Sequence, residues 1–258
     1  MSPEDGGARW LRRPPGAEAA DVRLFCFHHA GGAASLYRRW PQLMPASIEP
    51  IAVQLPGRAE RFREPAIDRM APLVEALTDV MKPLWDRPFA CFGLSMGARV
   101  AWALAHHLRE RAMPMPIALY LASAAAPGTV EDQLEWEQDL VGYLRSMGGT
   151  PPEVLAEPQL LDSLLPVLRA DMTLIDAFRF RAATPLDIPI RVFAGMDDVD
   201  HSPERMAGWR WETSGRFQLD PRPGGHFPDA AGELRLIQTV ADDLLAEHAY
   251  RSMGVVDD

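Results

Sequence analysis

The sequence is poor in cysteine and lacks any long apolar run. It has only two cysteines, Cys26 and Cys91, each inside a short apolar segment. A disulfide framework needs more cysteines and an oxidising compartment, so we expect both thiols to be free and buried. The longest apolar run, Ile117 to Ala126, is about half the length of a membrane-spanning helix. Residues 1–20 lack the apolar core of a signal peptide. These absences predict a cytoplasmic protein without a membrane partner.

Positive charge is also scarce. The chain of 258 residues has a net charge of −10, which argues against nonspecific binding to nucleic acid or to an anionic membrane. A local basic docking surface is still compatible with this balance, because arginines gather in the first quarter of the chain: Arg12, Arg13, Arg38, Arg39, Arg58, Arg61 and Arg63. The length suits one large α/β domain over residues 1–258, since two independent cores would be cramped.

Short apolar runs alternate with helical patterns along most of the chain. The runs lie at residues 23–27, 49–54, 89–92, 117–123 and 190–194, and their continuous apolar character is typical of strands buried on both faces of a parallel sheet. Helical spacing follows at residues 100–111 and again at 234–245. This alternation predicts a doubly wound α/β sheet, with the core at about 9–250 and loose ends at 1–8 and 252–258.

One stretch, about 128–184, shows helical patterns and no strand pattern. Its apolar stripe comprises Leu161, Leu164, Leu168, Met172 and Ile175. Pro166 falls inside the stripe, so we expect the helix to kink or restart there. A helical insertion between two strands predicts a lid, and the alternative is a set of helices that merely covers the sheet.

The segment around Ser95 has the pattern of a nucleophile turn. A buried strand runs into Gly93-Leu-Ser95-Met-Gly97 and then into a helix. A sharp strand-to-helix turn lifts the serine hydroxyl clear of the sheet, and the two glycines remove side chains that would collide. The helix directs its N-terminus at the site, so the N–H of Met96 is a candidate oxyanion donor. The alternative is a plain structural turn.

Serine needs a base and an acid partner, which follow in the order Asp or Glu, then His, in folds of this type. The strand at 190–194 leads into Gly195-Met-Asp197-Asp198, and the spacing from the glycine favours Asp198 over Asp197. The cluster from Asp197 to His201 resembles a metal site, but further ligands at metal spacing are missing, so we predict no metal.

His226 is the predicted base. It lies in Pro223-Gly-Gly-His226-Phe, just before the last helix, and it alone among the seven histidines combines this chain order with a glycine-flanked loop. The second oxyanion donor should come from the loop after the first strand, residues 28–33, where the N–H of Ala30 is the candidate. We expect His28 and His29 to shape that loop.

Four stretches resemble the type II, or editing, thioesterases that accompany polyketide and nonribosomal peptide synthases. They are residues 24–32, 54–65 (Gln-Leu-Pro-Gly-Arg-Ala-Glu-Arg-Phe-Arg-Glu-Pro), 93–97 and 224–227, and a fifth, 165–171, resembles the lid of that family. Together they cover the chain from about Trp10 to the last helix. Residues 54–65 are the most specific, because general esterases do not need them.

The resemblance implies a lidded α/β-hydrolase that acts, without a cofactor, on acyl groups held on the phosphopantetheine arm of an acyl or peptidyl carrier protein. It implies Ser95, Asp198 and His226 as the catalytic triad, with the N–H groups of Ala30 and Met96 as oxyanion donors. Two residues depart from the family pattern: Leu94 stands where the family often has His, and His28 where it often has Pro. Leu94 is therefore expected to affect the shape of the pocket.

Several alternatives remain open on the sequence alone. The chain could be a product-releasing thioesterase or cyclase, a general carboxylesterase, or a catalytically silent α/β-hydrolase. We expect Arg58, Arg61 and Glu64 to form a structural ion-pair network under the active-site rim, and carrier docking is the alternative role for them. A monomer is expected because no extra apolar face is evident.

Overall fold

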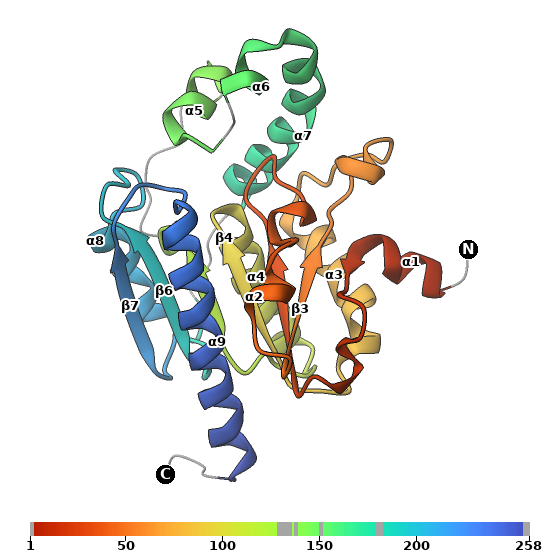
Figure 1. Cartoon of the computed structure of the whole chain (residues 1–258), viewed down its shortest axis with the longest axis vertical. Helices are drawn as coiled ribbons and strands as arrows, with labels where there is room; N and C mark the ends of the chain where they lie inside the picture. Colours follow the sequence, from red (N-terminus) through yellow and green to blue (C-terminus); the bar gives the residue numbers. More distant parts are fainter. Residues whose placement is uncertain (1–2, 128–135, 137–138, 150–151, 179–182, 255–258) are drawn as a thin grey trace.

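A seven-stranded sheet forms the centre of the computed structural model, which describes residues 3–127, 136, 139–149, 152–178 and 183–254. The strand order is β1-β3-β2-β4-β5-β6-β7, with all neighbours parallel except β1 and β3 (Figure 1). The strands are β1 Leu11–Arg12, β2 Val22–Phe27, β3 Ile48–Val53, β4 Phe89–Leu94, β5 Leu119–Ala122, β6 Ile190–Gly195 and β7 Phe217–Arg222. The five predicted strands are confirmed, and β1 and β7 are additions.

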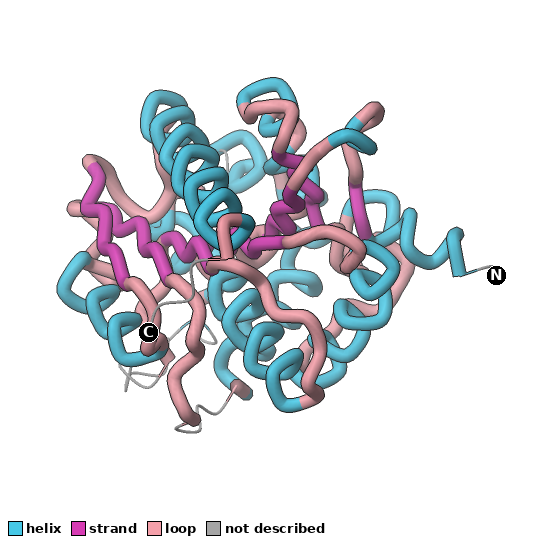
Figure 2. Tube along the Cα trace, turned by 90° about the horizontal axis from the view of Figure 1, so that it is seen from below, coloured by secondary structure: helices cyan, strands magenta, loops and turns pink. Residues whose placement is uncertain are grey.

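Helices cover both faces of the sheet (Figure 2). Alternate residues of each strand point to opposite faces, so Phe25 packs in one apolar cluster and Leu24 in the other. One cluster includes residues of α3 (Met70–Met81) and α4 (Met96–Glu110), and the other includes residues of α2 (Trp40–Leu43) and α9 (Ala230–Ser252). Cys26 and Cys91 are buried free thiols, as predicted. The α/β-hydrolase prediction is confirmed.

The amino-terminal segment differs from the prediction of a loose end. Residues Pro3–Trp10 form helix α1, and the guanidinium of Arg61 stacks on the Trp10 ring at 4.1 Å from its centroid. This partner lies far along the chain, so the local pattern could not reveal it. The remaining short elements are α8 Pro203–Met206 and the 3₁₀ helices η1 Ala17–Ala19, η2 Ala34–Tyr37, η3 Ala59–Arg61, η4 Lys82–Leu84 and η6 Ala207–Glu212.

A helical insertion joins β5 to β6 and lies above the ends of the strands (Figure 1). It contains α5 Leu140–Met147, α6 Pro152–Ala156 and α7 Pro158–Ala177. The predicted limits, about 128 and 184, adjoin residues 128–135 and 179–182, which lie outside the described residues. Of the predicted kink or restart at Pro166, the restart is wrong, because α7 continues through this residue. Pro166 is exposed, so water can take the place of its missing N–H as a partner for the Asp162 carbonyl.

None of the helices in the described ranges is both long enough and apolar enough to cross a membrane.

Candidate active site

Ser95 lies at a strained turn between β4 and α4. Its φ is +56°, in the left-handed region that non-glycine residues seldom adopt. A Cβ on Gly93 would lie 2.3 Å from the Gly97 backbone, and a Cβ on Gly97 would lie 2.1 Å from the Phe27 carbonyl oxygen. Glycine is therefore required at both positions for the strand and helix to approach each other this closely, as the sequence pattern predicts.

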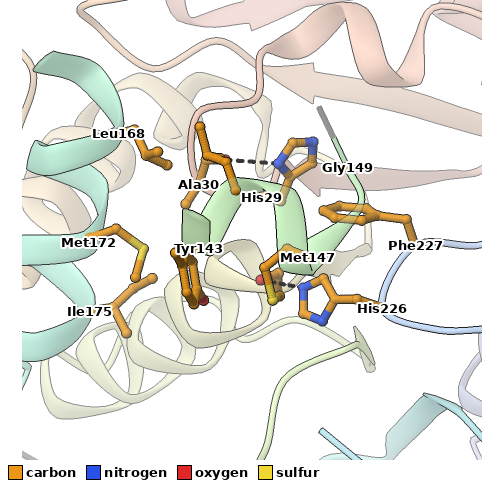
Figure 3. Close-up of a pocket in the computed structure, with 12 residues that line it drawn as sticks. His29, Ala30, Tyr143, Met147, Gly149, Leu168, Met172, Ile175, His226 and Phe227 are labelled. Carbon is orange, nitrogen blue, oxygen red and sulfur yellow. Dashed lines mark hydrogen bonds between the residues drawn. The ribbon is translucent and has the colours of Figure 1, made fainter. Parts of the chain in front are cut away.

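A chain of hydrogen bonds runs from Ser95 to Asp198 through one imidazole. His226 Nε2 lies 3.0 Å from Ser95 Oγ, and His226 Nδ1 lies 2.8 Å from Asp198 Oδ2 (Figure 3 shows His226 beside the pocket). An ionised carboxylate only accepts hydrogen bonds, so Nδ1 donates to Asp198 and Nε2 is left to accept the serine proton. The structure thus brings together the three residues that the sequence pattern singles out.

Asp198, and not Asp197, faces the imidazole. Asp198 is 5% exposed, and its Oδ1 also accepts a hydrogen bond of 3.1 Å from the N–H of His201. Burial by itself raises the pKa of Asp198, but the hydrogen bonds and charge interactions with His226 and His201 together outweigh burial and hold that pKa below its ordinary value. Asp197 is exposed, and its N–H donates to the Gly224 carbonyl. The carboxylate beside His226 therefore stays ionised.

His201 is a second buried histidine at the site, which the sequence analysis considered only as part of the cluster from Asp197 to His201. Its ring centroid lies 5.1 Å from that of His226, and its Nδ1 accepts a hydrogen bond of 3.1 Å from the N–H of Ala125. Burial lowers the pKa of His201 to about 3, with the nearby His226 as the next cause. His201 is therefore neutral at physiological pH.

The loop that carries His226 is held from behind by two residues that the sequence did not reveal. Ser123 Oγ donates a 2.5 Å hydrogen bond to the His226 carbonyl, and Arg222 Nη2 donates a 2.8 Å hydrogen bond to Ser123 Oγ. Both side chains are buried. Arg222 ends β7, whose mixed polar sequence carries no buried-strand pattern, so no local signal could have identified it.

The two predicted oxyanion donors flank the serine. Met96 is the first residue of α4, and Ala30 lies in the loop after β2 and lines the same pocket as Ser95. Within the described residues, neither N–H donates to a protein acceptor. His28 is buried, and His29 packs edge-on against Phe227 with its Nδ1 2.9 Å from the Ala30 carbonyl. Both histidines thus lie in the loop at residues 28–33, which they were predicted to shape.

The pocket beside Ser95 is small and its far wall is apolar (Figure 3). Its cavity volume is about 40 Å³, room for only a few heavy atoms. The helical insertion supplies Tyr143 and Met147 from α5 and Leu168, Met172 and Ile175 from α7. The described residues contain no group of three or more His, Cys, Asp or Glu side chains placed to hold a metal ion.

A larger groove adjoins this pocket. Its volume is about 460 Å³, and it shares His29, Gly149 and Phe227 with the pocket wall. Exposed Arg38 and Arg39 line the groove further out. Leu94, which was expected to affect the shape of the pocket, lines the groove and not the small pocket.

The predicted ion-pair network forms only in part. Arg61 pairs with Glu64, with its Nε 3.0 Å from Glu64 Oε2. Arg58 instead pairs with Asp171 on α7, where Nη1 and Nη2 lie 2.7 and 2.8 Å from the two carboxylate oxygens. The prediction that Arg58 joins Arg61 and Glu64 is therefore wrong, because its partner comes from the helical insertion. Both arginines are buried, so neither adds an exposed charge to the rim.

The match to a family model decides which family these features belong to. Residues 22–244 match the family described as "Thioesterase domain". The chain belongs to the thioesterase family. The match spans all three hydrogen-bonded residues of the site as well as the whole helical insertion.

Similar proteins agree with the match to the thioesterase family. RedJ from Streptomyces coelicolor, a thioesterase of the prodiginine biosynthetic pathway, is 33% identical with a TM-score of 0.81, covering 90% of this chain and 89% of RedJ. BorB, a type II thioesterase from the borrelidin biosynthetic cluster, is 29% identical with a TM-score of 0.79, covering 93% of this chain and 97% of BorB. LgrE from Brevibacillus parabrevis, named linear gramicidin dehydrogenase, is 36% identical over 96% of this thioesterase and 97% of LgrE.

Proposed function

We propose that this thioesterase hydrolyses acyl groups from the phosphopantetheine arm of acyl or peptidyl carrier proteins, and so removes stalled or aberrant groups from a polyketide or nonribosomal peptide synthase. The observation that carries the proposal is the hydrogen-bonded chain from Ser95 through His226 to Asp198 beside a small apolar pocket. The relatives supply the setting, since RedJ and BorB are thioesterases of biosynthetic pathways. The proposal includes a single domain that acts as a monomer in the cytoplasm. It also includes that the enzyme needs no cofactor.

Acylation begins with attack of Ser95 Oγ on the thioester carbonyl carbon. His226 Nε2 takes the serine proton, and Asp198 keeps the imidazole in the tautomer that can accept it. The negative charge that develops on the carbonyl oxygen is stabilised by the N–H groups of Met96 and Ala30. The carbon–sulfur bond then breaks, and the pantetheine thiolate takes the proton from His226.

Deacylation repeats the steps with water. His226 removes a proton from a water molecule, the resulting hydroxide attacks the acyl-serine carbonyl, and the same N–H groups hold the oxyanion. The ester bond breaks, and the proton returns from His226 to Ser95 Oγ. The enzyme is regenerated and the acyl group leaves as a carboxylic acid.

The two cavities fit the two halves of the proposed substrate. The pocket of about 40 Å³ beside Ser95 suits a short acyl group and disfavours a full-length product. The groove of about 460 Å³ that continues from His29 and Phe227 suits the pantetheine arm, and Arg38 and Arg39 lie along it where an acidic carrier would approach. This arrangement favours editing over product release.

The direct test is mass spectrometry of intact carrier proteins loaded with short, branched and full-length acyl groups, before and after addition of enzyme. We expect short acyl groups to be released fastest, and we expect no release by Ser95→Ala. Release of a single mature chain alone would favour a product-releasing thioesterase. Faster cleavage of oxygen esters than of carrier thioesters would favour a carboxylesterase.

The contribution of the groove can be tested separately by charge reversal. Arg38→Glu with Arg39→Glu should raise KM for an acyl-carrier substrate about tenfold and leave a small acyl thioester unaffected, because only the carrier is acidic. Added salt should reproduce the effect on the wild type. Arg210→Glu, an exposed arginine on η6, is the matched control. Equal salt dependence for both substrates would exclude carrier docking by these charges.

A further inference from the structure

Asp171 links the helical insertion to the loop that carries Ala30. This residue lies on α7, only 1% exposed, more than a hundred residues from that loop in sequence. Its Oδ2 accepts a hydrogen bond of 2.7 Å from the N–H of Gly31. Gly31 directly follows Ala30, whose own N–H faces no protein acceptor within the described residues. A lid side chain therefore holds the backbone beside a proposed oxyanion donor.

Arg58 holds the Asp171 carboxylate in place. The two groups form the bidentate pair described above, and Arg58 is 6% exposed. Arg58 Nη1 also donates a 3.3 Å hydrogen bond to the Gly32 carbonyl, and its Nε donates to the Pro56 carbonyl at 3.2 Å. A planar guanidinium fixes the orientation of a carboxylate as well as neutralising its charge. The pair thus holds the loop at both Gly31 and Gly32.

The backbone at Gly31 makes this hydrogen bond sensitive to the position of α7. Gly31 has φ +74°, and a Cβ there would lie 3.4 Å from Leu168 Cδ1 and 3.5 Å from Leu164 Cδ1, so α7 packs directly over the loop. Leu168 also lines the pocket beside Ser95. The same helix therefore forms the acyl-pocket wall and holds the oxyanion loop, so a shift of α7 changes both at once.

We infer that Asp171 and Arg58 are positioning residues that couple the seating of α7 over the pocket to the geometry of the oxyanion loop. The loop has its catalytic geometry only while α7 is packed with Asp171 on the Gly31 N–H. The inference rests on the proposed function of Ser95 and of the Ala30 N–H. It assigns to the lid a part in transition-state stabilisation as well as in access.

The test compares four variants by their hydrolysis of a small acyl-pantetheine thioester. Asp171→Ala removes the acceptor and should lower kcat about 10- to 100-fold, with KM within about threefold, because a misplaced oxyanion donor acts on the transition state. Asp171→Asn keeps an oxygen that can accept the hydrogen bond from the Gly31 N–H, so kcat should fall less than in Asp171→Ala. Arg58→Met with Asp171→Leu removes both charges, so thermal stability should exceed that of Asp171→Leu alone while kcat stays low.

A second readout separates positioning from folding. Binding of a trifluoromethyl ketone analogue, which forms an oxyanion on Ser95, should weaken in Asp171→Ala by the same factor as kcat, and binding of an unreactive thioether analogue should not change. Glu49→Gln is the matched control, because it breaks the buried Arg23–Glu49 pair at the other end of the sheet. It should lower the melting temperature and leave kcat within about twofold of wild type.

Two results would overturn the inference. The first is a kcat in Asp171→Ala within twofold of wild type, and the second is recovery of kcat together with stability in the double variant. Ser95→Ala and the wild type are measured in the same assay. If the wild type cleaves no thioester, or Ser95→Ala cleaves as the wild type does, the proposed function fails. Normal wild-type turnover with unaffected Asp171 variants refutes the coupling alone.

Discussion

The sheet and the helical insertion contribute to the site in different ways. Ser95, Asp198 and His226 lie on turns and loops next to β4, β6 and α9, and their hydrogen bonds of 2.8 and 3.0 Å are backed by large apolar clusters on both faces of the sheet. The insertion has a small apolar cluster of its own, formed by Trp136, Leu140, Leu144, Leu168 and Met172. Its contribution to the pocket is mostly an apolar wall.

This difference indicates that the sheet region holds the proposed reacting groups, whereas the insertion forms the wall against which the acyl group would lie. Reacting groups need fixed distances, which the densely packed sheet provides, whereas an acyl chain needs only a cavity of suitable volume and polarity. Asp171 is the exception, because it extends from the insertion to the loop that carries Ala30, the proposed oxyanion donor. Substitution of the three hydrogen-bonded residues next to the sheet should therefore abolish turnover, and substitution of the pocket wall of the insertion should change which acyl group is preferred.

The largest expected effect comes from the sheet region. Ser95→Ala or His226→Ala should lower kcat by about four to six orders of magnitude, because the first removes the nucleophile and the second the base. Asp198→Asn should lower kcat by about 10⁴-fold, because the carboxylate that fixes the imidazole tautomer is lost. The measurement is hydrolysis of a small acyl thioester. Asp197→Asn is the control at the neighbouring exposed carboxylate and should stay within about twofold. Full turnover in Ser95→Ala would contradict the triad.

A smaller effect is expected from the insertion. Met172 is fully buried on α7 and lines the pocket, so Met172→Ala should raise the ratio of kcat/KM for a longer acyl chain over that for a short one by about tenfold. The measurement is kcat/KM for a series of acyl-pantetheines of increasing acyl-chain length. Leu160→Ala on the exposed face of the same helix should leave the profile unchanged. An unaltered profile in Met172→Ala would place the acyl group elsewhere.

The smallest effect concerns the free energy of unfolding at acid pH, which should depend on His201, a buried residue in the sheet region. Burial lowers the pKa of His201 to about 3 from an ordinary 6.5. In this interval the unfolded chain binds the proton and the folded chain does not, so unfolding becomes easier as pH falls from 6.5 towards 3. One such histidine changes the free energy of unfolding by about 1.4 kcal/mol per pH unit.

Urea denaturation at pH 7.0, 6.0 and 5.0 measures this dependence. His201→Gln should have a shallower decline than wild type, and a residual slope should remain because burial also lowers the pKa of His28 and of His106. An identical slope in the variant and the wild type would show that His201 takes up its proton without unfolding the chain.

Much of the fold could be predicted because its signals are local. Continuous apolar runs identify β2 to β6, and Gly93 and Gly97 identify the turn that carries Ser95, since a close approach of strand and helix excludes any side chain there. The signals fail where a contact is distant. Helix α1 ends at Trp10, which contacts the distant Arg61, and β7 lies at the edge of the sheet, where its mixed polar sequence is tolerated.

The sequence by itself determined the chain order of the proposed triad, serine, then carboxylate, then histidine, and the glycine spacing at each turn favoured Ser95, Asp198 and His226. Only the tertiary structure placed Asp198 against His226, paired Arg58 with Asp171, and limited the pocket to about 40 Å³. The physical reason is that hydrogen bonds, ion pairs and cavity volume depend on distances between atoms far apart in the chain, and those distances exist only once the insertion packs over the sheet.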